Sequence, residues 1–262
     1  MLRLLPVAAL LGLAAAAPLP PVTAVPGFAD IAALTLAAPV IVRATIGKAE
    51  RLNERDAPGV AAGSARLLVT AKLDAALVAP GAVPAEISYL VEVPLDAKGR
   101  AAKLKGAIVL LFLRPGERAG QFALAGGLGQ VAANPVVETA VRGIVADARS
   151  GGAPVVTGIG NAFHVPGSVP GEAESQFFLT TADARPVSLV VLSRPGQVKT
   201  LTLALGDVID DSAAPVKPGT LLWYRLACFL PKTLPAGGDD RAALAEDYAF
   251  VLSSLGPCNR AS

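Results

Sequence analysis

Short apolar runs separated by turn residues follow one another through most of this chain. Apolar and polar side chains alternate over residues 87–93 and 199–205, which is typical of strands with one buried face. The continuous apolar run over residues 108–113 is typical of a strand buried on both sides. Similar runs predict further strands over residues 39–48, 66–78, 121–125, 155–165, 175–181, 187–192 and 220–230.

Two segments predict helices. Residues 134–148 place apolar side chains on one helical face, with Asn134 as the N-cap and Pro135 at the first helical position. Residues 239–255 form a second amphipathic pattern, capped by Asp239 or Asp240. The inward candidates of this second helix are Leu244, Tyr248, Val251, Leu252 and Leu255.

The order of these elements predicts a mainly β protein with two helices. Residues 28–133 form a β-barrel-like domain, residues 134–150 a connecting helix, and residues 151–262 a second β domain with a C-terminal helix. Residues 220–231, TLLWYRLACFLP, contain the only tryptophan of the chain, and we interpret them as the central strand of the second half.

One part of the chain resembles a known family. The apolar strand VIVRATIGKAERL, a long turn, ARLLVTAKLDAALV, a Gly/Pro linker, ISYLVEV and the hairpin GAIVLLFLRPGERAGQFALAGG follow in that order. Over residues 38–130 this order resembles exported OB-fold domains related to netrin-like and metalloprotease-inhibitor modules. Those inhibitors present an N-terminal cysteine to the protease metal, and this chain has none there, so the resemblance does not imply inhibition.

The N-terminus predicts export. Residues 1–16 combine the basic Arg3, an apolar region and small residues, as in a signal peptide, and residues 17–27 form a proline-rich linker. A retained membrane anchor is the alternative, although the apolar run is short and contains Pro6. We therefore expect a periplasmic or secreted protein with no transmembrane segment in the mature chain.

The net charge limits the kinds of partner to expect, and the cysteine content predicts a disulfide bond. The formal net charge is +2, and removal of Arg3 with the signal peptide leaves about +1, so nucleic acid is not an expected partner. The only two cysteines, Cys228 and Cys258, predict one disulfide bond in an exported chain. A reactive pair is the alternative, but the CxxC spacing is absent.

Candidate chemistry is sparse. His164, the only histidine, lies between a strand and a loop, where a general base could act with the nearby Glu172 and Glu174. The alternative for His164 is a structural role, in which it hydrogen-bonds the backbone of its own loop. The alternative for Glu172 and Glu174 is a solvent-exposed acidic turn. Without a GxSxG motif, a serine-hydrolase triad has little support.

Other residues suggest weaker sites. Three aspartates could hold calcium or cap turns, namely Asp207, Asp210 and Asp211. Residues 126–129, GGLG, lack the following helix and acid of a phosphate loop, so we interpret them as a hairpin exit. Five aromatic residues could line a ligand groove or fill the core: Phe163, Phe177, Phe178, Trp223 and Tyr224.

These observations predict a non-catalytic, exported binding or envelope-associated protein without a cofactor. The expected partner is a protein, a peptide or a glycan. One alternative is a hydrolase acting on an envelope polymer through His164, Glu172 and Glu174. Another alternative is a protease-inhibitor-like module.

Overall fold

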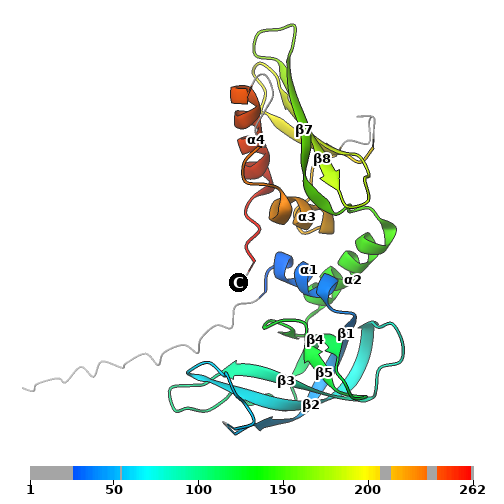
Figure 1. Ribbon diagram of the computed structural model, residues 1–262, viewed down its shortest axis with the longest axis vertical. Helices are drawn as coiled ribbons and strands as arrows, with labels where there is room; N and C mark the ends of the chain where they lie inside the picture. Colours follow the sequence, from blue (N-terminus) through cyan, green and yellow to red (C-terminus); the bar gives the residue numbers. More distant parts are fainter. Residues whose placement is uncertain (1–25, 54, 207–213, 235–240, 261–262) are drawn as a thin grey trace, which may run out of the picture.

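The computed structural model describes residues 26–53, 55–206, 214–234 and 241–260. It contains two β-sheets, with helices between them and beside the second sheet (Figure 1). The predicted signal peptide, residues 1–16, and most of the predicted linker lie outside the described residues. The mainly β prediction is confirmed, but the described chain has four helices rather than two.

The first sheet curves into a nearly closed, barrel-like form. Its strand order is β3-β2-β1-β4-β5, and β6 also pairs with β4. The segment around Gln121 returns to β3, where the Ser88 amide donates to the Gly120 carbonyl oxygen over 2.8 Å. The strands are β1 (Val40–Arg51), β2 (Ser64–Val78), β3 (Glu86–Pro94), β4 (Ile108–Pro115), β5 (Phe122–Leu124) and β6 (Gln130–Ala132).

The alternation seen in the sequence explains the interior of this sheet. On β3, Ile87, Tyr89, Val91 and Val93 are buried, whereas the residues between them face outward or are half-buried. The run on β4 is buried on both sides, since Val109 and Leu111 join the barrel interior while Leu110 and Phe112 belong to a separate core. A strand with two apolar faces therefore links the barrel to the rest of the molecule.

That separate core lies between the two sheets. Helices α1 (Phe28–Ala37), α2 (Pro135–Ser150) and α3 (Leu221–Phe229) surround it (Figure 1). Asn134 caps α2 as predicted, because its side chain accepts a hydrogen bond from the Val137 amide at 3.0 Å. Helix α1 was not predicted: it is apolar on nearly every side, so its sequence has almost no helical periodicity.

The second sheet is an antiparallel meander of four strands covered by a helix. Its order is β10-β9-β8-β7, with β7 (Val156–Pro166), β8 (Ala173–Thr181), β9 (Val187–Ser193) and β10 (Thr200–Ala204). Helix α4 (Arg241–Leu255) packs on one face, and four of its five predicted inward residues are buried. Its predicted caps, Asp239 and Asp240, lie outside the described residues.

The strand predicted over residues 220–230 is wrong, because this stretch forms α3. The Thr220 hydroxyl accepts a hydrogen bond from the Trp223 amide at 3.2 Å and so caps the helix. Leu221 and Tyr224 face the core between the sheets, while Leu226 and Ala227 face the second sheet. A short helix buried on several sides has the same continuous apolar pattern as a buried strand.

The predicted pairing of Cys228 with Cys258 is present. The two Sγ atoms are 2.07 Å apart and the Cα atoms 5.0 Å apart. The bond ties the end of α3 to the segment after α4. Trp223 supports the same junction, because its Nε1 donates to the Leu255 carbonyl oxygen over 2.8 Å.

Candidate functional site

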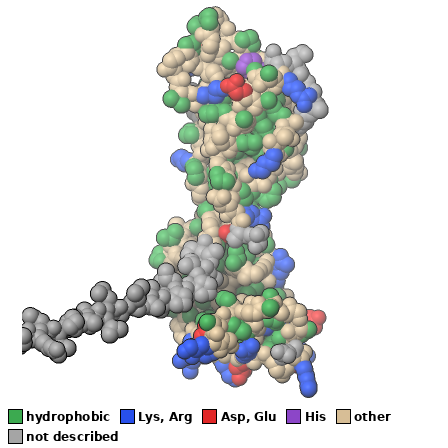
Figure 2. All heavy atoms as spheres, turned by 90° about the vertical axis from the view of Figure 1, so that its left-hand side faces the viewer, with side chains coloured by type: hydrophobic (Ala, Val, Ile, Leu, Met, Phe, Trp, Pro, Cys, Tyr) green, Lys and Arg blue, Asp and Glu red, His purple; other side chains and the backbone are tan. Residues whose placement is uncertain are grey.

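His164 belongs to a polar cluster beneath α4. It lies on β7 directly opposite Ser175 on β8, and its Nδ1 is 2.8 Å from the Ser175 Oγ. Asp247 of α4 lies over both, with its Oδ2 at 2.5 Å from the Ser175 Oγ and 3.6 Å from the His164 Nδ1. Ser175 and Asp247 are buried, and 15% of the His164 side chain is exposed. The only histidine, purple in Figure 2, reaches the surface of this half of the molecule.

Lys199 completes the cluster. Its Nζ donates to the Asp247 Oδ1 over 2.7 Å and to the Glu246 Oε1 over 3.0 Å. The hydrogen bond to Asp247, more than that to Glu246, raises the pKa of Lys199. The Asp247 carboxylate is thus bound by a cation and a hydroxyl, so its charge is compensated although it is buried.

The hydrogen bonds assign the protons of this cluster. A hydroxyl has one hydrogen, and the Ser175 hydrogen goes to the Asp247 carboxylate, which only accepts. The Ser175 Oγ therefore accepts from the His164 Nδ1–H. In a hydrolytic triad the histidine lies between the serine and the acid and takes the serine proton. Here the serine lies between the other two and is inaccessible, so the arrangement fastens α4 to the sheet.

The structure does not bring Glu172 and Glu174 into this cluster. Glu174 pairs with Val165 across the hairpin, one position from Ser175, so its side chain lies on the opposite face and bonds Gln176. Glu172 lies in the β7–β8 turn, with its side chain against Gly167. The partners of His164 instead come from distant positions, so no local motif predicted Ser175, Lys199 or Asp247.

The aromatic candidates are distributed among separate places. Phe177 is buried against Tyr248, with ring centroids 5.4 Å apart, and Trp223 packs on Phe28 at 6.1 Å. Phe163 is partly exposed beside Phe178, at 5.5 Å. These residues do not form one aromatic groove.

Metal binding finds no support in the part of the chain that the structure describes. No group of three His, Cys, Asp or Glu side chains is placed there to hold an ion. The candidate residues Asp207, Asp210 and Asp211 lie outside the described residues.

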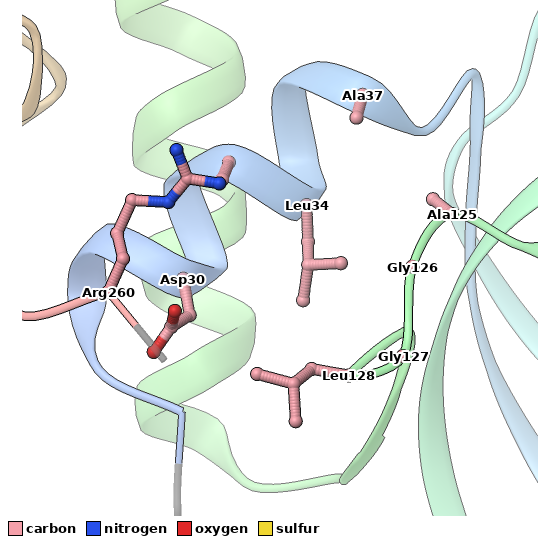
Figure 3. Close-up of a pocket in the computed structure, with 9 residues that line it drawn as sticks. Asp30, Leu34, Ala37, Ala125, Gly126, Gly127, Leu128 and Arg260 are labelled. Atoms are coloured by element: carbon pink, nitrogen blue, oxygen red, sulfur yellow. The ribbon is translucent and has the colours of Figure 1, made fainter. Parts of the chain in front are cut away.

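Gly126, Gly127 and Leu128 of the GGLG loop line a hollow beside α1, with a volume of about 260 Å³. Figure 3 shows the Leu34 and Leu128 side chains pointing into it, with Arg260 beyond Asp30 at one end. The Asp30 carboxylate accepts a hydrogen bond from the Gly27 amide at 3.0 Å, so it serves the start of α1. The loop itself is a tight turn, because a Cβ on Gly129 would lie 2.9 Å from the Leu124 Cβ.

A second hollow, on another side of α1, lies between the two halves and has a volume of about 310 Å³. We call it the junction groove. Leu36, Val155 and Phe229 line it, and 44%, 46% and 49% of these residues, respectively, are exposed. Its remaining lining residues are Ala33 and Ala37 of α1, Val156 of β7, and Tyr224 and Arg225 of α3.

Arg225 is the only charged residue that lines the junction groove. It is half-buried, and in the described part of the chain it makes no hydrogen bond or ion pair. Burial, and then the nearby charge of Arg185, lower the pKa of Arg225. The nearby carboxylate of Asp183 is already paired with the Arg185 Nε at 2.5 Å. An incompletely compensated cation therefore lies in a wall that is otherwise uncharged and mostly apolar.

Comparisons with known protein families and with curated proteins gave no match to this chain. Among the described helices, none is long and apolar enough to cross a membrane.

Proposed function

We propose that this chain is an exported, non-catalytic binding protein that holds an apolar ligand in the junction groove. The observation that carries the proposal is the gathering of three exposed, large apolar side chains, Leu36, Val155 and Phe229, around one hollow. Clustered exposed apolar residues mark binding sites far more often than isolated ones do.

The place of the groove supports this proposal. Small-molecule sites occur preferentially where two structural units meet, and the smallest have volumes of about 300 Å³. The groove takes its walls from α1 on the barrel side and from α3 and β7 on the other side. A ligand there would contact both halves.

Export is supported by the disulfide bond between Cys228 and Cys258, since such bonds persist mainly outside the reducing cytoplasm. It is also supported by the signal-like residues 1–16.

Mass spectrometry of the chain from a periplasmic or secreted fraction tests export and should find an N-terminus that begins at Ala17. A chain that retains Met1 in the cytoplasm would contradict export.

We also propose that the first sheet is an OB-like barrel. Support comes from the order in which β1, β2, β3, β5 and β4 neighbour one another around the sheet, and from the parallel bridge between Ser88 and Gln121 that joins the β3 and β5 sides. An experimental structure in which the β5 side separates from β3 would contradict this assignment.

The hydrolase alternative has weaker support. Ser175 is inaccessible and already donates to Asp247, and Glu174 lies on the other face of the hairpin. The inhibitor alternative has no metal-directed N-terminal cysteine to act with. Neither the hydrolase nor the inhibitor alternative is supported by a nucleophile or a metal-binding group next to a described pocket.

The binding proposal is tested with N-phenyl-1-naphthylamine, a neutral probe that fluoresces in apolar sites. Leu36→Asp places a charge in the groove and should weaken probe binding at least about tenfold, the loss that follows from the cost of burying a carboxylate beside the probe. Leu90→Asp is the matched control, because Leu90 is 46% exposed on β3 and does not line the groove. Equal probe binding by both variants and the wild type would sink the proposal.

A further inference from the structure

The junction groove has one charged lining residue, Arg225, and its charge would favour some apolar ligands over others. The other lining residues are Tyr224 and apolar residues of α1, α3 and the start of β7. A guanidinium has five N–H donors and remains charged at neutral pH. Its planar fork matches the two oxygens of a carboxylate.

We infer that the junction groove binds an aliphatic carboxylate, with the acid group on Arg225 and the hydrocarbon chain along Leu36, Val155 and Phe229. This inference rests on the proposed binding function and specifies its ligand. A neutral apolar ligand would leave the guanidinium without a partner, whereas a carboxylate supplies the opposite charge.

The surroundings of Arg225 favour an external partner. Asp183 pairs with Arg185 through the Nε atom, and Arg185 also donates to the Gly151 carbonyl oxygen, which holds this acid-base pair in place. The pair therefore offers Arg225 little net negative charge. Because burial weakens its hydration, Arg225 gains more from a carboxylate than an exposed arginine would.

The size of the groove favours a small molecule. Its volume of about 310 Å³ lies at the lower end of the range for small-molecule sites, roughly 300–1,000 Å³. Six of its eight lining residues lie on helices α1 and α3, whereas an extended peptide would pair with the free backbone groups of a strand edge. A medium-length aliphatic acid satisfies both features.

Decanoate and decanol test the inference, because they share an apolar chain and differ in the acid group. Isothermal titration calorimetry below the critical micelle concentration should give wild-type binding of decanoate that is roughly 10- to 100-fold tighter than that of decanol, as charge-assisted hydrogen bonds predict. Arg225→Gln should abolish this difference and leave decanol binding unchanged. Arg194→Gln, which removes an exposed arginine outside the groove, should behave as the wild type.

The outcomes separate this inference from the proposed function. Equal binding of the two ligands by the wild type overturns the carboxylate assignment but leaves apolar binding in place, and this comparison needs no variant to fold. Failure of both ligands and of the naphthylamine probe to bind overturns both proposals. Tighter binding of N-acetyl-Ala-Leu-Leu, with a free carboxylate, would assign the groove to peptide ends and overturn the aliphatic acid.

Discussion

At the residue scale, neighbouring groups decide what each polar side chain does. His164 was the best sequence candidate for a general base, yet its Nδ1 is engaged by Ser175 and therefore by Asp247. The sequence did not predict a role for Arg225, because a single arginine inside an apolar run matches no binding or catalytic motif. The two residues differ because, within the described part of the chain, contacts with distant residues occupy the Nδ1 atom of His164 but leave the guanidinium of Arg225 without a hydrogen bond. No local sequence pattern encodes such contacts.

A buried tyrosine gives a prediction at this scale. The Tyr248 hydroxyl donates to the Pro231 carbonyl oxygen over 2.6 Å, and burial raises the pKa of Tyr248 to about 12. The folded protein therefore keeps a proton that the unfolded chain loses above about pH 10. Below about pH 10 the protonated Tyr248 makes its full contribution to the free energy of unfolding. As the pH rises further, the free energy of unfolding decreases, by about 2–3 kcal/mol at pH 12.

Urea unfolding of the wild type and of Tyr248→Phe measures this effect. At pH 8 the variant should be less stable by about 1 kcal/mol, the value of a hydrogen bond, and the deficit should shrink or reverse by pH 12. Val251→Ala, on the same helix, removes buried apolar volume without a titrating group, so its deficit should stay constant. A Tyr248→Phe deficit that does not change with pH would show that the hydroxyl does not titrate as described.

At the element scale, alternation and helix caps predicted most of the secondary structure, while apolar segments without a polar face were missed or wrongly assigned. The strands around Tyr89 and Phe112 and the helix capped by Asn134 all follow local rules. Helices α1 and α3 each pack against several other elements, and Leu36 and Phe229 on their exposed sides are also apolar, so neither sequence shows which face is buried. Only the packing of the whole chain determines that these segments are helical.

The disulfide bond gives a prediction at the element scale. It closes a loop with a sequence separation of 30 residues between α3 and the segment after α4, which corresponds to about 3–4 kcal/mol in the chain-entropy model. Cys228→Ser with Cys258→Ser should therefore lower the melting temperature of the oxidised protein by several degrees.

Melting with and without reductant provides the control. Reduction should lower the melting temperature of the wild type to that of the double variant and leave the double variant unchanged. An oxidised wild type that melts at the same temperature as the double variant would mean that the bond does not stabilise the fold.

At the scale of the whole molecule, the two sheets have separate cores, and three helices form another core between them. The junction groove lies at this connection and combines segments around residues 33–37, 155–156 and 224–229. Sequence analysis could place a connecting helix between two β regions, but not a groove assembled from positions so far apart. The same arrangement exposes Leu36, Val155 and Phe229 together.

Ligand binding in this groove is the central claim, and methyl nuclear magnetic resonance tests it most directly. Decanoate is titrated into protein carrying labelled leucine and valine methyl groups. We predict that the methyl signals of Leu36 and Val155 shift with ligand concentration, while those of Leu90, on the outer side of β3, stay in place. Absence of shifts at Leu36 and Val155, or shifts concentrated around Leu90, would contradict binding in the junction groove.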